Sequence, residues 1–267
     1  MTLKELLKQD KPLIMGVLNV TPDSFSDGGK FINPALAFNH CLQLIQDGAD
    51  LIDIGGESSR PGSEPISIDE ELSRILPVIH KIKSIQDIKI SIDTYKPEVM
   101  RIAIQEGVDL INDIKAFKNP ESIKVVRESN VIVSLMHMQG SPNNMQLNPT
   151  YKDVKQEVFK FLNEQQEFCL NNDIDLDRII IDPGFGFGKT TQHNWILFNH
   201  LEYLKQINPS LLIGVSRKMM LKELVGESLD QLDDATAFFS AKAVQKGAKI
   251  VRVHNVKKTK QYIDLLT

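Results

Sequence analysis

Polar side chains stand at or near the ends of short apolar runs along this sequence. One group consists of hydrogen-bond acceptors, and the other of hydroxyl and cationic side chains. The acceptors are Asn19, Asp53, Asp93, Asn112 and Asp182, and the second group is Ser216, Arg217, Lys218, Arg252 and His254. A carboxylate can accept two parallel N–H bonds from a heterocycle, whereas arginine and lysine hold phosphate or carboxylate groups. The set therefore predicts a substrate with amide-like donors at one end and anionic groups at the other.

The apolar runs that carry these residues are rich in leucine, isoleucine and valine. They cover residues 13–19, 51–55, 88–93, 110–114, 131–136, 178–182, 211–216 and 250–254. Because they lack a strict polar alternation, they are typical of parallel strands that are buried on both faces.

Helical patterns lie between several of these runs. They are predicted at residues 35–47, 97–106 and 153–170, and a further helix opens with the capping-box pattern from Ser67 to Glu70. Pro77 is expected to kink this helix or to break one of its turns. Strands alternating with helices over the whole length predict an α/β fold, a single-domain (β/α)8 TIM barrel covering residues 1–267. An open doubly wound sheet is the alternative.

The composition excludes several classes of protein. With 42% hydrophobic residues and a net charge of -4, the chain can bury a sizeable core and has no general attraction to nucleic acid or anionic membrane. The two cysteines, Cys41 and Cys169, are far apart, so we expect no disulfide framework. No run of about 18 apolar residues appears. We therefore expect a cytoplasmic protein that acts on small molecules, with no nucleic-acid or membrane partner.

Three longer segments without a helical or strand pattern follow the first, second and fifth predicted strands. They cover residues 19–33, 55–67 and 136–149. Segments of this length are usually binding loops or lids. The glycine-rich stretch DPGFGFGKT at residues 182–190 could be taken for a phosphate-binding P-loop, but Pro183 stands where that motif needs glycine.

Eight motifs together resemble the dihydropteroate synthase family. They are NVTPDSFSDGG (19–29), GGESSRPG (55–62), IDTYKP (92–97), IND (111–113), MHMQG (136–140), DPGFGFGK (182–189), SRK (216–218) and RVH (252–254). They occur in the family's order and span nearly the whole chain. The resemblance implies a (β/α)8 transferase of folate biosynthesis. It would join 6-hydroxymethyl-7,8-dihydropterin diphosphate to p-aminobenzoate by a dissociative, carbocation-like substitution, giving 7,8-dihydropteroate and pyrophosphate. It also implies Mg2+ and a homodimer.

The same resemblance assigns a role to each matching residue. Pterin binding falls to Asp93, Asn112, Ile114, Met136, Asp182, Gly214 and Lys218. The diphosphate falls to Asn19, Arg60, Arg252 and His254, with Asn19 also meeting the metal. The p-aminobenzoate site falls to Ser59, Arg60, Pro61, Phe187 and Ser216. The catalytic residues would be Asp93, Asp182, Lys218, Arg252 and His254.

Other interpretations of the same residues remain open at this point. A single Asp or Asn at a strand end is often only the cap of the next helix. Asn19 could brace its own loop, Asp53 could be a buried brace for the cations, and His137 has no clear role. A barrel that moves a methyl group from methyltetrahydrofolate to a corrinoid protein shares the pterin-binding residues, but it would not need the SSRPG loop or the SRK and RVH cations. A pterin-binding barrel without turnover is a third possibility.

Overall fold

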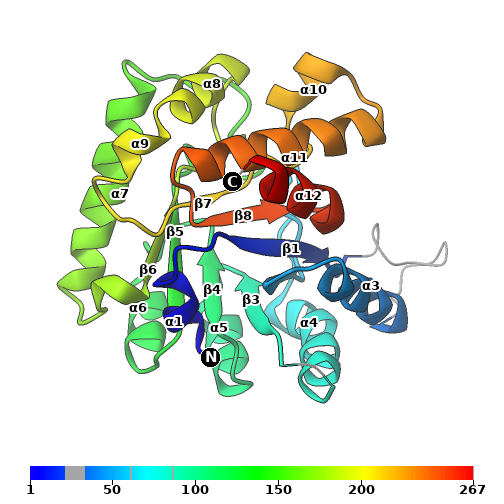
Figure 1. Ribbon diagram of the computed structural model, residues 1–267. Coiled ribbons are helices and arrows are strands. Elements are labelled where there is room, and N and C mark those ends of the chain that lie inside the picture. Colours follow the sequence, from blue (N-terminus) through cyan, green and yellow to red (C-terminus); the bar gives the residue numbers. More distant parts are fainter. Residues whose placement is uncertain (22–33, 61, 86, 267) are drawn as a thin grey trace.

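Eight parallel strands form a nearly closed barrel with helices around its outside (Figure 1). The computed structural model describes residues 1–21, 34–60, 62–85 and 87–266. Hydrogen-bonded strands follow the order β6-β5-β4-β3-β2-β1-β8-β7, and a bridge between Ile181 and Leu211 links the two ends of this sheet. The strands are β1 (Leu13–Asn19), β2 (Leu51–Gly55), β3 (Lys89–Asp93), β4 (Leu110–Asp113), β5 (Ile132–Met136), β6 (Ile179–Asp182), β7 (Leu212–Ile213) and β8 (Ile250–Val253). The predicted barrel is confirmed, and the open-sheet alternative is wrong.

Helices connect consecutive strands, as the alternating sequence pattern predicts. The connecting helices are α3 (Pro34–Gln46), α4 (Ile68–Lys83), α5 (Pro97–Gln105), α6 (Pro120–Arg127), α7 (Val154–Leu170), the 3-10 turn η1 (Leu176–Arg178), α8 (Thr191–Asn199), α9 (Leu201–Leu204), α10 (Met219–Val225) and α11 (Leu229–Gln245). Two more lie outside the series: α1 (Leu3–Leu7) precedes β1, and α12 (Val256–Leu266) follows β8. The Ser67 side chain caps α4 by accepting a hydrogen bond from the Glu70 N–H, and the helix continues through Pro77 as one element. Within the described residues, no helix is long and apolar enough to cross a lipid bilayer.

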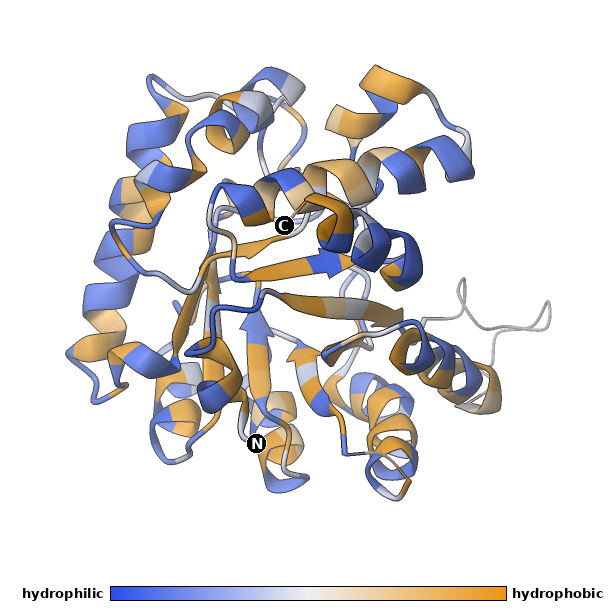
Figure 2. Ribbon diagram, viewed as in Figure 1, coloured by the Kyte–Doolittle hydropathy of each residue, from blue (hydrophilic) through white to orange (hydrophobic). Residues whose placement is uncertain are grey.

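Side chains alternate between the inside of the barrel and the surrounding helices, because residues two apart share one face of a strand. The inward residues near the strand starts form a buried apolar cluster with Leu3 of α1: Leu13, Met15, Leu51, Leu110, Ile132, Ile180, Leu212 and Ile250. Residues between them, such as Ile14, Ile52 and Ile111, join the larger core that includes the helices. In Figure 2 the strands are accordingly mainly orange, with blue near the tip of β8.

Polar groups occupy the next inward positions along the same strands. Each lies two residues beyond an apolar member of the inner cluster: Asp53 after Leu51, Asn112 after Leu110, Ser134 after Ile132, Asp182 after Ile180 and Arg252 after Ile250. The parallel direction of all eight strands brings these positions to one end of the barrel. The fold therefore gathers the predicted site residues at the carboxyl ends of the strands.

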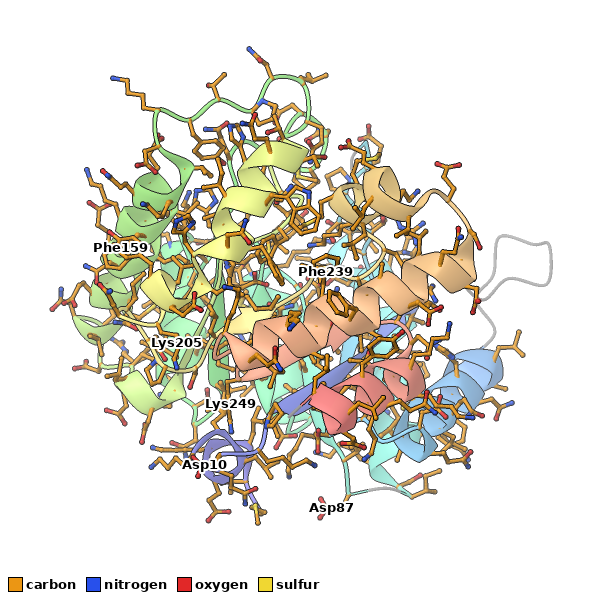
Figure 3. The ribbon with its side chains drawn as sticks, turned by 45° about the horizontal axis from the view of Figure 1, so that its top comes forward. Asp10, Asp87, Phe159, Lys205, Phe239 and Lys249 are labelled. Carbon is orange, nitrogen blue, oxygen red and sulfur yellow. The ribbon has the colours of Figure 1, made fainter. Side chains whose placement is uncertain are left out.

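The opposite end of the barrel is closed by the segment that precedes β1. Leu3 of α1 packs into the inner apolar cluster, and the Lys249 ammonium donates to the Lys11 carbonyl oxygen at 2.7 Å. Figure 3 shows Lys249 and Asp10 beside α1. This closure leaves the carboxyl end as the place for a ligand.

β7 is much shorter than the predicted run 211–216. It pairs with β8 only through Leu212 and Ile213. The chain then turns, with the Lys218 N–H donating to the Val215 carbonyl oxygen at 3.2 Å and Arg217 at φ 57. Residues 214–216 are therefore a connection to the site and not part of the strand.

Candidate active site

Arg252 joins two carboxylates inside the barrel. Its Nε lies 2.6 Å from Asp53 Oδ2, and its Nη2 lies 3.2 Å from Asp93 Oδ2. Asp53 is fully buried and also accepts a hydrogen bond from the Ser91 hydroxyl at 2.5 Å. Burial opposes the charge of Arg252, but Asp53 and Asp93 outweigh it and raise the pKa of the guanidinium. Asp53 is thus the brace for the cation that the sequence suggested as one interpretation.

The environment of Asp93 disfavours the charged form of its carboxylate. Burial raises its pKa, the nearby carboxylate of Asp53 raises it further, and Arg252 opposes both effects. The net shift is upward from the ordinary value. The free protein therefore binds a proton at this carboxyl more tightly than a solvated aspartate does.

Asn112 presents a buried acceptor without a partner. It is in register with Asp93 on one side and Ser134 on the other. Its side-chain oxygen Oδ1 has no hydrogen bond to any described residue. Leaving such an atom unsatisfied costs about 1–3 kcal/mol, so a ligand that donates a hydrogen bond here would relieve the cost. This oxygen is the clearest sign of a donor-bearing ligand.

Asp182 and Lys218 form the next part of the site. Asp182 Oδ1 accepts the Gly184 N–H at 2.7 Å. The Lys218 ammonium donates to the Phe185 carbonyl oxygen and lies 4.8 Å from the centre of the Phe187 ring. Burial lowers the pKa of Lys218 to about 8, while Asp182 pulls it upward. Lys218 therefore interacts both with Asp182 and with the ring of Phe187.

Ser216 and His254 form a hydrogen-bonded pair. The Ser216 hydroxyl lies 2.8 Å from His254 Nδ1, and the His254 backbone N–H donates to the same hydroxyl at 3.2 Å. Burial, together with Arg217 and Arg252, lowers the pKa of His254 to about 3. At neutral pH the free protein therefore presents a neutral imidazole here, which can offer an N–H donor but not a charge.

Arg217 is paired with a carboxylate of α11. Its φ of 57 places it in the left-handed region, which is uncommon for a residue with a side chain. Its guanidinium makes a two-pronged ion pair with Asp233, at 2.7 and 3.0 Å. Asn255 donates to the same carboxylate at 3.0 Å. Of the three residues in the SRK motif, Arg217 serves as a brace, while Ser216 and Lys218 contact other site residues.

The second loop is anchored at its base by Lys96. The Lys96 ammonium lies 2.6 Å from Glu57 Oε2 and 2.7 Å from Glu71 Oε2, and it donates to the Ile66 carbonyl oxygen at 2.6 Å. Beyond this anchor Ser59 is partly exposed and Arg60 exposed. Arg60 is one of the charges that lower the pKa of His254.

The glycines of the DPGFGFGK segment allow close approach to the backbone after β5. Gly184, Gly186 and Gly188 have φ values of 66, 78 and 61. A Cβ atom on Gly184 would lie 2.0 Å from the His137 carbonyl oxygen, and one on Gly188 would lie 2.3 Å from the Gln139 carbonyl oxygen. No side chain fits at these two positions. The segment is therefore a tightly packed wall of the site, and the glycines serve this packing.

The remaining predicted residues have different surroundings. Asn19 Oδ1 and Asp93 Cβ flank Gly55, at 3.5 and 3.7 Å from the place of a Cβ on that glycine. A Cβ on Gly214 would lie 3.7 Å from Arg252 Cβ, and Met136 Cγ is 3.2 Å from the corresponding point on Gly184. Ile114 is buried directly after β4. Pro61 and residues 22–33 of the first loop lie outside the described residues.

Several contacts were not predicted from the sequence. Glu57 and Lys96 both lie inside motifs that carried the family resemblance. Their place in these motifs is the sequence feature that could have indicated a contact. Asp233 had no such signal, because its partner Arg217 was expected to face the ligand. The described residues also contain no group of three or more His, Cys, Asp or Glu side chains that could hold a metal.

Comparisons with known proteins agree with this geometry. A family model described as "Pterin binding enzyme" matches residues 15–254. The dihydropteroate synthase of Haemophilus influenzae is 44% identical over 248 residues, which are 93% of this chain and 90% of that protein. Among solved structures, the dihydropteroate synthase of Xanthomonas albilineans with 4-aminobenzoic acid has a TM-score of 0.90 and 42% identity, and covers 96% of this chain and 92% of that chain. The same organism's enzyme in complex with 7,8-dihydropteroate has a TM-score of 0.86 and 40% identity, with the same coverage. The chain therefore belongs to the pterin-binding enzymes, within the dihydropteroate synthase family.

Proposed function

We infer that this barrel is a transferase of folate biosynthesis that condenses 6-hydroxymethyl-7,8-dihydropterin diphosphate with p-aminobenzoate. The products are 7,8-dihydropteroate and pyrophosphate. The supporting observation is the meeting, at one end of the barrel, of the acceptors Asp93, Asn112 and Asp182, the last two of them buried, with the cations Lys218 and Arg252. A pterin has N–H donors that suit the acceptors, and a diphosphate suits the cations.

The substitution is dissociative and carbocation-like. The bond between the pterin methylene carbon and the diphosphate oxygen breaks, and a bond forms between that carbon and the p-aminobenzoate nitrogen, whose proton then leaves to solvent. An aromatic amine is neutral near pH 7, so it needs no strong base before it attacks. Arg252 receives the developing charge of the diphosphate, and His254 offers an N–H donor to it. Asp93 and Asp182 orient the pterin and stabilise the positive charge left on the methylene group.

Asn19 is the residue that we assign to Mg2+. Asn19 is the last residue of β1, and its Oδ1 lies 3.5 Å from the place of a Cβ on Gly55. Mg2+ commonly takes only one or two protein oxygens and fills its other positions with substrate phosphates and water. One amide oxygen near the diphosphate end fits this pattern, although it would not hold the ion alone. When bound, Mg2+ would neutralise charge on the diphosphate and make it a better leaving group.

Pyrophosphate release is the direct test of the reaction. The purified protein is mixed with the dihydropterin diphosphate, p-aminobenzoate and Mg2+, and each component is omitted in turn. We expect release only with both substrates, with dihydropteroate in equal amount, and strongly dependent on Mg2+. Pterin binding without any release would contradict the assignment and favour a barrel without turnover.

The pKa of Lys218 predicts a limit to activity at high pH. Lys218 is a cation below its pKa of about 8 and loses its charge as the pH rises through that value. The charged form is the one that assists pterin binding beside Asp182. We therefore expect kcat/KM for the dihydropterin diphosphate to fall above about pH 8, since this ratio reports the free enzyme. A Lys218→Met variant should have a lower and flatter profile. The same decline in that variant would assign the titration to another group.

We further propose that two copies of the chain associate through the exposed face of α10 and α11. Leu224, Leu229 and Phe238 are 57%, 58% and 39% exposed there, and Leu224 and Phe238 line one surface groove. Contiguous exposed apolar surface of this kind commonly marks an interface. Sedimentation velocity should give twice the mass of one chain, and Phe238→Glu should shift the equilibrium toward the monomer. A wild-type protein that sediments as a monomer would refute this proposal.

We also propose that residues 1–267 act as a single pterin-binding domain in the cytoplasm. The matched residues 15–254 and the eight strands cover nearly the same part of the chain, which supports one domain. Cys41 and Cys169 are both free and buried, which suits a reducing compartment.

A further inference from the structure

Lys189 is a buried lysine surrounded by acceptors from two loops. Only 2% of its surface is exposed to solvent. The ammonium nitrogen lies 2.8 Å from the Gly184 carbonyl oxygen, 3.0 Å from that of Phe187 and 3.2 Å from that of His137. The fourth neighbour is His137 Nδ1, at 2.9 Å. Among the described residues, no carboxylate lies within ion-pair distance of this nitrogen.

This environment explains the state of His137. While Lys189 is an ammonium it has three N–H donors and no acceptor, so His137 Nδ1 can only accept from it and the ring proton is on Nε2. Burial and the charge of Lys189 lower the pKa of His137 to about 2, in agreement with a neutral ring. Burial also lowers the pKa of Lys189 well below its ordinary value. A neutral amine would still have two N–H donors for the three carbonyl oxygens around it.

Through these three carbonyl groups, Lys189 clamps one turn of the site wall. The Phe187 N–H donates to the Gly184 carbonyl oxygen at 3.1 Å, so residues 184–187 form a closed turn. Lys189 binds the carbonyls at both ends of this turn and also the end of β5 at His137. The Cβ clash that Gly184 avoids is with the same His137 carbonyl. Lys189 thus fixes the turn against β5 at the point where the two backbones touch.

The clamped turn carries one group of the proposed p-aminobenzoate site, the Phe187 ring, and one contact of the pterin-binding Lys218. Phe187 supplies the aromatic ring beside the Lys218 ammonium, and Phe185 supplies the carbonyl oxygen that the same ammonium binds. The Phe185 side chain is itself anchored in the core, fully buried beside Phe198. A shift of the turn would therefore move the ring of Phe187, whereas the Phe185 carbonyl oxygen that binds Lys218 is held in place by the buried Phe185 side chain.

We propose that Lys189 is a positioning residue that holds the Phe187 wall against p-aminobenzoate. This inference rests on the proposed function, because the ring of Phe187 is assigned to that substrate. Lys189 itself is too deeply buried to touch either substrate. The acceptors that bind the pterin, Asp93, Asn112 and Asp182, all lie on strands, so they depend less on the turn than Phe187 does. Loss of the clamp should affect p-aminobenzoate more than the pterin.

Arg178 provides a matched control for the loss of a buried cation. It is 6% exposed and, like Lys189, donates to main-chain carbonyls: to Val126 at 2.7 Å and to Val131 at 3.0 and 3.1 Å. It precedes the first residue of β6, whereas Lys189 follows the last one, so it lies at the other end of the barrel. Arg178→Met should destabilise the fold without moving the site wall.

The test compares Lys189→Met with Arg178→Met and the wild type in steady-state assays with each substrate varied. We expect the KM for p-aminobenzoate to rise about tenfold in Lys189→Met, with the KM for the dihydropterin diphosphate and kcat within about twofold. Arg178→Met should leave both KM values unchanged despite a similar fall in Tm. If Lys189→Met does not fold, Lys189→Gln, which keeps two N–H donors, gives the same comparison with a smaller rise.

Two results would overturn the proposal. An unchanged KM for p-aminobenzoate in the folded variant would show that Lys189 supports the fold only. Equal increases in both KM values, or the same increase in Arg178→Met, would show a general loosening of the barrel. A wild type that forms no dihydropteroate refutes the proposed function itself, so the two failures are distinguishable.

Discussion

A glutamine in place of Arg252 is expected to lower kcat/KM about a thousandfold and the free energy of unfolding by about 3 kcal/mol. The two losses have different causes. Activity falls because the guanidinium no longer meets the diphosphate that leaves in the reaction. Stability falls because Asp53, whose side chain is fully buried, loses the partner that lies 2.6 Å away, and Asp93 loses one at 3.2 Å. Initial rates and denaturant unfolding measure the two effects separately.

A second substitution separates these causes. In the double variant Asp53→Asn with Arg252→Gln, the buried carboxylate that was left unpaired is gone, so the free energy of unfolding should partly recover. The kcat/KM should stay as low as in the single variant, because no cation has returned. Asp53→Asn alone keeps Arg252 and its contact with Asp93, and should be much more active than either. Recovery of activity in the double variant would mean that Arg252 only neutralises Asp53 and does not meet the diphosphate.

The positions of the site residues could be predicted because they follow from simple periodicities. Residues at the carboxyl ends of parallel strands meet at one end of a barrel, and inward positions recur every second residue. Asp53, Asn112 and Arg252 each lie two residues past an apolar inward residue, so their gathering needed only the strand assignments. The same reasoning gave the bounds of β1 and β2 as the structure has them.

The pairing of these side chains could not be predicted in the same way. Arg252 and Asp53 are 199 residues apart, and several carboxylates end neighbouring strands, so the sequence does not select the partner. Arg217 was grouped with the cations expected at the site, yet its left-handed backbone sends its side chain to Asp233. Lysine can bind phosphate or carbonyl oxygens equally well, and only the packing after β5 shows that Lys189 binds carbonyls.

Asp93→Asn is expected to lower kcat about a hundredfold while raising the KM for the dihydropterin diphosphate only a few-fold. Asparagine keeps the shape and one acceptor oxygen, so it can still contact the pterin. It removes the negative charge, which we propose stabilises the positive charge on the methylene group as the diphosphate leaves. Asp87→Asn is a control for the change of charge, because that side chain is 96% exposed; it is labelled in Figure 3. Equal losses in kcat and in pterin binding would contradict the electrostatic role.

The same variant should change how stability depends on pH, and the sign follows from the direction of the shift. The pKa of Asp93 is raised by burial and by Asp53, so the folded protein binds this proton more tightly than the unfolded chain does. The resulting stabilisation is complete below the ordinary value of 3.8 and is lost as the pH rises through the raised folded value. Asparagine cannot titrate, so the free energy of unfolding of Asp93→Asn should fall less than that of the wild type over this interval. Parallel curves for the two proteins would show that Asp93 has an ordinary pKa in the folded protein, because Arg252 keeps its carboxylate ionised.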